Sequence, residues 1–158
     1  MARVREVSGF DCDEPFARAG PRVVVVRAAE VFEQAEGVLD LGDIEPVHDM
    51  RVATRRLRAA LEVFEPCFPR KRFRKTLKRV KALADALGER RDRDVAIAFL
   101  EGVADGVASD DCAALANTVE RLREEQRTAN EALAREVAPK RLKKLRRRLD
   151  KLVKAAEA

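Results

Sequence analysis

The sequence is poor in aromatic residues and lacks the features that disulfide-rich and membrane-spanning proteins share. Its 158 residues include no Trp and no Tyr, and aromatic residues amount to 4%. Few side chains can stack on bases, which argues against a binder of single-stranded nucleic acid. The three cysteines are scattered and contain no C-x-x-C pair, which argues against a disulfide framework and a cysteine zinc site. No apolar run is long enough to cross a bilayer.

Motifs of catalysis, cofactor binding and secretion are also missing. There is no glycine-rich phosphate loop, dinucleotide fingerprint or nucleophile elbow, so we expect no enzyme activity, no catalytic residues and no cofactor. Acidic residues occupy the N-terminal region, where a secretory signal would have an apolar segment, and this favours a cytoplasmic protein. The one histidine, His48, forms an E-x-x-H pair with Glu45. Di-metal bundles need this pair twice, so no metal site is expected.

Charge, in contrast, is abundant and strongly segregated along the chain. There are 33 Lys and Arg residues against 28 Asp and Glu residues, and the net charge is +5. Residues 1–45 carry a net charge of −5, residues 46–94 of +8, residues 95–138 of −5 and residues 139–158 of +7. Such alternating blocks are informative about charged partners more than about the fold.

Hydrophobic periodicity predicts an all-α protein, a single domain of residues 1–158 built as an antiparallel helical bundle of about five to six helices. Helices are expected over residues 21–39, 44–64, 69–87, 90–103, 109–137 and 139–158, with residues 1–14 loosely held. Gly88 is expected to end the third helix and Pro139 to break the fifth. The fifth helix has a heptad seam, expected to pack nearly antiparallel to its neighbours, that consists of Leu115, Val119, Leu122, Gln126, Ala129 and Leu133.

The predicted second helix carries a row of cations away from its apolar face. At about 3.6 residues per turn, His48, Arg51, Arg55 and Arg58 lie on one stripe, and Arg56 lies off it. Guanidinium groups suit phosphate oxygens because the planar fork donates two parallel hydrogen bonds and stays charged. Like charges one turn apart cost about a few tenths of a kcal/mol per pair. The row is therefore better explained by an anionic partner than by stability.

The third and last predicted helices are basic as well. Residues 70–81 contain eight basic side chains and no acidic one. Arg74, Lys78 and Lys81 cluster on one flank of the apolar stripe, whereas Lys75 and Arg79 lie on the other. The last helix adds nine basic side chains between residues 140 and 154. If these helices are neighbours, we expect their basic stripes to converge on one groove.

Two strings, in fitting order and spacing, carry a resemblance to a known family. Residues 47–64, V-H-D-M-R-V-A-T-R-R-L-R-A-A-L-E-V-F, and residues 87–95, L-G-E-R-R-D-R-D-V, resemble the CHAD family, the conserved histidine α-helical domain. The resemblance covers roughly residues 20–137. It implies a helical bundle that binds inorganic polyphosphate through basic side chains. The binding residues expected from the motifs and from the helical wheel are His48, Arg51, Arg55, Arg56, Arg58, Arg74, Lys78, Lys81 and Arg91.

The family's usual domain has two similar helical halves, and this sequence resembles the first of them. Either the chain forms a homodimer that rebuilds a two-sided cavity, or a single bundle leaves its basic face open. Binding of nucleic acid or of polyanions in general, and a helical assembly module, are the alternatives; no membrane partner is expected. Association with polyphosphate granules is left open. Asp92 and Asp94 are expected to cap the fourth helix, with Asp92 orienting Arg91 or another arginine.

Overall fold

The computed structural model describes residues 4–9, 11, 13–106 and 109–157, and every regular element in these ranges is a helix. In chain order the elements are α1 (Phe16–Glu33), α2 (Glu45–Val63), the short 3₁₀ helix η1 (Glu65–Cys67), α3 (Arg70–Val103), the short 3₁₀ helix η2 (Ala104–Gly106), α4 (Ser109–Val137) and α5 (Pro139–Lys154). The predicted all-α fold class is confirmed for the described chain.

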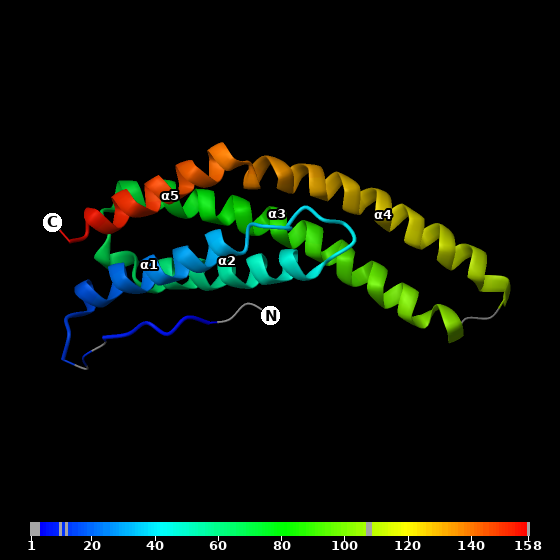
Figure 1. Cartoon of the computed structure of the whole chain (residues 1–158), viewed down its shortest axis with the longest axis horizontal. Helices are drawn as coiled ribbons and strands as arrows, with labels where there is room; N and C mark the ends of the chain where they lie inside the picture. Colours follow the sequence, from blue (N-terminus) through cyan, green and yellow to red (C-terminus); the bar gives the residue numbers. More distant parts are fainter. Residues whose placement is uncertain (1–3, 10, 12, 107–108, 158) are drawn as a thin grey trace.

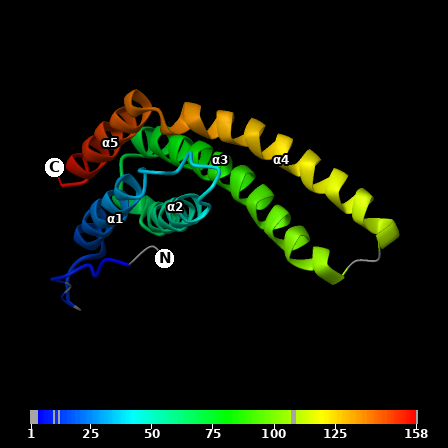
Figure 2. The same ribbon diagram turned by 45° about the vertical axis from the view of Figure 1, so that its right-hand side comes forward.

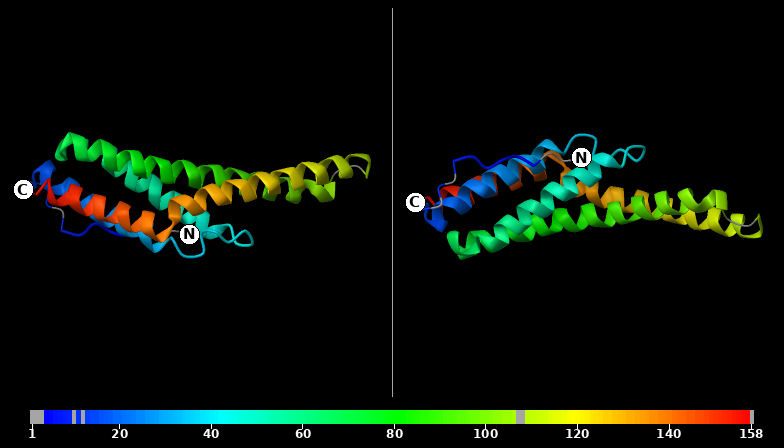
Figure 3. Two further views of the ribbon diagram at one scale, coloured as in Figure 1. Left: turned by 90° about the horizontal axis from the view of Figure 1, so that it is seen from above. Right: turned by 90° about the horizontal axis from the view of Figure 1, so that it is seen from below.

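Four helical segments form a bundle, and a two-helix arm extends from it. The bundle consists of α1, α2, the first half of α3 and α5 (Figure 1). Both α1 and α3 pack against α2 and against α5, and α2 and α5 lie on the two flanks of the buried stripe of α3, around one shared core. The second half of α3 leaves the bundle and pairs with α4, as the turned view shows (Figure 2). Seen from above and from below, the far ends of α3 and α4 reach well beyond the other helices (Figure 3).

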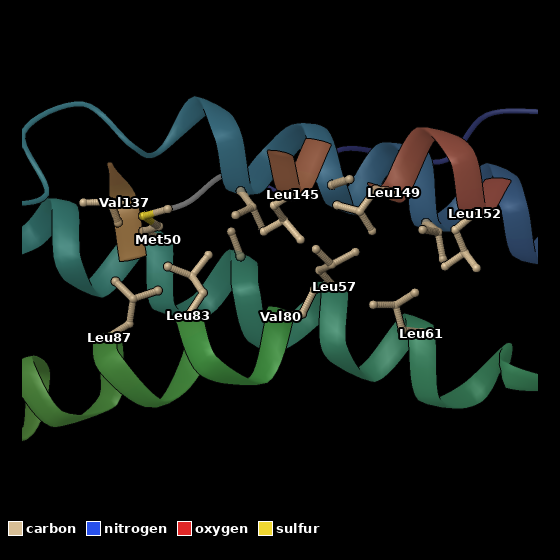
Figure 4. Packing of buried hydrophobic residues seen from close by; sticks show 14 of the residues in the cluster. Met50, Leu57, Leu61, Val80, Leu83, Leu87, Val137, Leu145, Leu149 and Leu152 are labelled. Carbon is tan, nitrogen blue, oxygen red and sulfur yellow. The ribbon is translucent and has the colours of Figure 1, made fainter. Parts of the chain in front are cut away.

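The bundle core consists of the apolar stripes that helical periodicity predicts (Figure 4). Its buried side chains include Met50, Leu57, Leu61, Val80, Leu83, Leu87, Leu145, Leu149 and Leu152. Burying a side chain of this size contributes about 1.5–3 kcal/mol relative to leaving it exposed. Because α2 contributes one continuous buried stripe, its rotation about its own axis is fixed, and its arginines are held on its other faces.

The predicted helix end at Gly88 is wrong, because α3 runs without interruption from Arg70 to Val103. A glycine inside a helix costs only about 1 kcal/mol relative to alanine. On either side of it, Leu87, Arg90 and Asp94 continue the same buried stripe. Packing against α2 and α4 therefore overrides the local stop signal, and the 34 residues form a rod of about 51 Å.

The start of α1 also differs from the prediction. The helix begins at Phe16, and Pro21 lies buried inside it. The ring of Phe16 lies 4.8 Å from that of Phe64, between ring centroids, and this contact holds the first turn against the end of α2. A Cβ on Gly20 would lie 2.9 Å from Cδ1 of Phe64 and 3.0 Å from Sγ of Cys67, so this close approach requires glycine.

The fifth predicted helix is confirmed in its bounds and in its seam. α4 ends at Val137 and α5 begins at Pro139. Within the seam, Val119, Gln126 and Leu133 are buried where α4 packs along α3. The heptad pattern therefore predicted the packing of the arm as well as the helix.

The N-terminal segment, which the sequence predicts to be loosely held, falls only partly within the described residues. Where it is described, it contacts α1. The backbone N–H of Arg5 donates to Oε1 of Glu30 over 2.7 Å, and Arg22 forms an ion pair with Glu14 over 2.6 Å. These contacts, with those from Arg22 to the backbone oxygens of Ser8 and Gly9, place residues 4–9 alongside α1.

Candidate functional site

A groove runs between α2 and α3, and arginines of the predicted row form one of its walls. Arg51, Arg55 and Arg58 follow one another along α2 at steps of about one helical turn. The other wall belongs to α3. The complete lining is Arg51, Arg55, Arg58, Ala84, Asp85, Gly88, Glu89 and Asp92. The two sequence strings that carry the family resemblance therefore meet in one groove.

The packing of both helices keeps this groove open. Leu57 and Leu61 of α2 are fully buried, so α2 cannot turn its arginines away without exposing them. On α3, Gly88 contributes no side chain to the groove, and a Cβ there would meet no atom within 4 Å. Arg51 and Arg55 therefore line a groove that no side chain fills at Gly88.

Glu62 neutralises part of the basic row. Its carboxylate lies 3.1 Å from Nε of Arg58 and 3.3 Å from Nζ of Lys81. The hydrogen bond from Arg58 is the main reason why the pKa of the Glu62 carboxyl is lowered; burial opposes it, and Lys81 lowers the pKa further. All three side chains are more than a third exposed, so each ion pair is worth at most about 1 kcal/mol. Arg58 and Lys81 nevertheless offer less free charge than the sequence suggests.

Arg51 and Arg55 are different, because neither has an ion pair or a side-chain hydrogen bond with another described residue. Three carboxylates of α3 also line the groove, namely those of Asp85, Glu89 and Asp92. They reduce the positive potential, although Glu89 is already paired with a neighbouring arginine of α3 over 2.6 Å. An anion in the groove would therefore meet two guanidinium groups, both on the wall that α2 forms.

Most of the other predicted binding residues lie outside the groove lining. His48 is half-buried in the first turn of α2, on the same stripe as the arginines. Arg56 is half-buried and does not line the groove. Arg74 and Lys78 are exposed on α3. Three of the nine predicted residues therefore line the groove. Lys81 does not line it, but Lys81 and Arg58 contact the same carboxylate, that of Glu62.

Arg91, the remaining predicted binding residue, makes a contact that holds helices together. Its Nη1 donates to the backbone oxygen of Ile44 over 3.3 Å, directly before α2 begins. That carbonyl group belongs to the residue that caps the start of α2. Arg91 therefore ties α3 to the beginning of the arginine-bearing helix, and it stands near the groove without lining it.

The second string also contains a buried polar network that sequence analysis missed. Arg90 is fully buried, and its Nε donates to Oδ1 of Asp94 over 2.9 Å. Its other nitrogens donate to Oδ1 of Asn130 over 2.7 Å and to the backbone oxygen of Asp40 over 3.2 Å. Gln126 donates to the same oxygen of Asp94 over 2.6 Å. The network joins α3, α4 and the loop before α2 at the point where the arm leaves the bundle.

The roles predicted for Asp92 and Asp94 are therefore wrong. Neither caps a helix, because both lie inside the continuous α3. Arg91 donates to a backbone oxygen rather than to Asp92, and Asp92 forms no ion pair with another arginine among the described residues. The sequence did contain a signal for the buried pair, since Arg90 and Asp94 are four residues apart and extend the apolar stripe of Leu87 once no break is placed at Gly88.

The basic stripes of α2 and α5 do not converge on one groove. α2 packs on the flank of α3 that carries Lys81, and α5 packs on the flank that carries Lys75. Nη1 of Arg72 donates to the backbone oxygen of Lys151, and Nη1 of Arg148 donates to that of Lys75, both over 3.5 Å. The cations of α5 therefore meet the second basic flank of α3, the one predicted to hold Lys75, and not the flank of Lys81.

Other kinds of site find no support within the part of the chain that the structure describes. There, no three His, Cys, Asp or Glu side chains gather closely enough to hold a metal ion. Cys12 lies outside the described residues, and neither Cys67 nor Cys112 is in a disulfide. None of the described helices is long and apolar enough to span a membrane.

Comparison with known proteins places the chain in a family. Neither the search of curated proteins nor that of solved structures found a match. Residues 26–158 match the family described as CHAD domain. The match includes the arginine-bearing α2, the whole of α3 and the basic α5, and it leaves out only the first 25 residues. The chain therefore belongs to the CHAD domain family.

Proposed function

We propose that this protein binds inorganic polyphosphate non-covalently, without chemical turnover, and that the α2–α3 groove makes the first contact. The observation that carries the proposal is the pair Arg51 and Arg55, two guanidinium groups about one turn apart and without an ion pair among the described residues. Membership of the CHAD family supports the same ligand.

The chemistry of the ligand fits this pair. Polyphosphate is a flexible chain of regularly repeated phosphates, and each phosphate exposes oxygens that a guanidinium fork can bind with two parallel hydrogen bonds. Arg74 and Lys78 are exposed on the outer side of α3 and extend the positive surface beyond the groove. We propose these residues as further phosphate contacts, with His48 as a donor at the start of α2.

Titration calorimetry with long-chain polyphosphate at several salt concentrations tests the proposal. Affinity is expected to fall linearly with the logarithm of the salt concentration, with a slope of about −0.7 for each phosphate contacted on a single-stranded polymer. Absence of binding at low salt would refute the proposed function. Light scattering with and without polyphosphate decides between a homodimer and a single bundle with an open basic face.

Competition at fixed ionic strength separates polyphosphate from nucleic acid. A labelled long polyphosphate is bound first and is then displaced by unlabelled polyphosphate, by single-stranded DNA or by duplex DNA, at equal phosphate concentration. We expect unlabelled polyphosphate to displace the label at a lower concentration than either DNA. Equal displacement by all three would instead identify a general polyanion binder, because the electrostatic attraction to phosphate does not depend on the polymer.

A further inference from the structure

A second group of basic side chains lies outside the α2–α3 groove, where α3 packs against α5. The two helices are antiparallel there, as the contacts from Arg72 to Lys151 and from Arg148 to Lys75 require. Lys144 lies one turn before Arg148 on the same side of α5. We call this set, Arg72, Lys75, Lys144, Arg148 and Lys151, the α3–α5 seam.

The seam contains basic side chains from both helices, and few carboxylates neutralise their charge. Among the described residues, none of its five side chains forms an ion pair with a carboxylate. Glu136, near the end of α4, is already engaged by other arginines, because it pairs with Arg79 over 3.5 Å and also with Arg141. The α2–α3 groove, by comparison, has three carboxylates in its lining.

Such an arrangement is unfavourable in the protein alone. Like charges on neighbouring helices repel each other, and the first turn of α3 adds no acidic residue that would offset the positive end of its helix dipole. The two guanidinium groups each donate to one backbone oxygen, which leaves their remaining N–H donors for other acceptors. Four of the five side chains are exposed, and that of Arg148 is half-buried, so a ligand can reach them.

The seam is connected to the groove by the outer side of α3. Lys71 and Lys78 are exposed, and on the helical wheel they lie between the flank that carries Lys81 and the flank that carries Lys75. A flexible polyanion leaving the groove would meet these lysines and then the seam. The path crosses the width of one helix, about 10–12 Å with its side chains, and it also runs about 14 Å along α3, from Ala84 of the groove to Lys75 of the seam.

We infer that the α3–α5 seam is a second binding surface for the same polymer, so that one long polyphosphate chain contacts both sides of α3. The inference rests on the proposed function, because it assigns a further part of the ligand's path. A second surface makes the affinity depend on the length of the polyphosphate. A short phosphate chain fills the groove alone, whereas a long one reaches the seam and gains its contacts.

The test compares two double variants of α5 that lose the same charge. Lys144→Ala/Lys151→Ala removes two seam lysines. Lys143→Ala/Lys154→Ala removes two exposed lysines that lie on the wheel away from α3. Each variant is titrated with tripolyphosphate, with long-chain polyphosphate and with duplex DNA at one ionic strength. All four lysines are exposed, so both variants are expected to fold.

The seam variant is expected to bind long-chain polyphosphate about 2-fold to 30-fold more weakly, the range that two exposed ion pairs supply. Its affinity for tripolyphosphate and the affinities of the matched variant should stay unchanged. Equal long-chain binding by the two variants would overturn the inference. So would a loss confined to DNA, which would make the seam a nucleic-acid surface. Failure of the unaltered protein to bind any polyphosphate would refute the proposed function itself.

Discussion

Arg90 and Asp94 form an ion pair in which both side chains are completely inaccessible to solvent, with 2.9 Å between Nε and Oδ1. The pair lies where the long helix α3 passes from the bundle into the arm, and Gln126 of α4 binds the same carboxylate oxygen. Each member makes the burial of the other tolerable, because an isolated buried charge costs several kcal/mol.

Replacing one member of this pair should strongly destabilise the protein. We expect Arg90→Met to lower the free energy of unfolding by about 3–5 kcal/mol, because Asp94 is left buried without its counter-ion. The double variant Arg90→Met/Asp94→Leu should recover only part of that loss, because it removes the unpaired buried charge but leaves Gln126 and the backbone oxygen of Asp40 without their partners. Urea denaturation measures both. The matched control Arg93→Met loses partly exposed ion pairs and should cost at most about 1 kcal/mol.

If Arg90→Met unfolds at the same urea concentration as the unaltered protein, the buried pair does not stabilise the junction between bundle and arm.

Substitution of Arg55 tests the groove. Arg55→Ala should weaken polyphosphate binding by about 1.5–3 kcal/mol, the usual worth of a charged hydrogen bond. Arg55→Lys should also lose affinity, since an ammonium group cannot donate two parallel hydrogen bonds to one phosphate. Titration calorimetry provides the affinities. Arg121→Ala is the control, because Arg121 is exposed on α4 in the arm. Equal affinities for Arg55→Ala and Arg121→Ala would remove Arg55 from the site.

Removal of the charge on Glu62 should strengthen binding. Glu62→Gln frees Arg58 and Lys81 from their shared carboxylate, and affinity should rise by about 2-fold to 5-fold, the worth of one exposed ion pair. Glu131→Gln changes the net charge equally on an exposed position of α4 and should have little effect. If the two variants bind alike, general charge explains the change and Glu62 does not restrain the basic row.

The Glu62 effect also has a defined pH dependence. Since the hydrogen bond from Arg58 lowers the pKa of Glu62, the carboxylate keeps its charge until the pH falls below the usual range of a glutamate. The ion pairs are therefore present at neutral pH and are lost only as the pH falls through that lowered pKa. The ratio of the affinities of Glu62→Gln and the unaltered protein should stay constant between about pH 8 and pH 5.

Two glycines should respond to alanine in opposite directions. Gly88 lies inside α3 with open space beside it, so Gly88→Ala should stabilise the protein by about 1 kcal/mol through helix propensity. Gly20→Ala should destabilise it by about 1–3 kcal/mol, because the added methyl group would clash with Phe64 and Cys67. Thermal unfolding of the two variants decides this, and a loss of stability in Gly88→Ala would mean that the helix needs glycine there.

Much of the candidate site follows from local pattern. The spacing of Arg51, Arg55 and Arg58 on a helix with one apolar face places them on one stripe whatever the rest of the chain does. The role of Arg58 was not predictable in this way. Glu62 lies one turn further along the same stripe, but whether it binds Arg58, Lys81 or both depends on where α3 lies.

The sequence by itself determined that this protein is helical, where most helices lie, and which faces of them are apolar or basic, because these properties depend on residues only a few positions apart. Only the tertiary structure decided that α3 continues through Gly88, that Arg90 and Asp94 are buried together, and that α2 and α5 pack on different flanks of α3. Each of these outcomes depends on packing between distant segments, whose combined burial outweighs a local preference of about 1 kcal/mol such as that of a glycine.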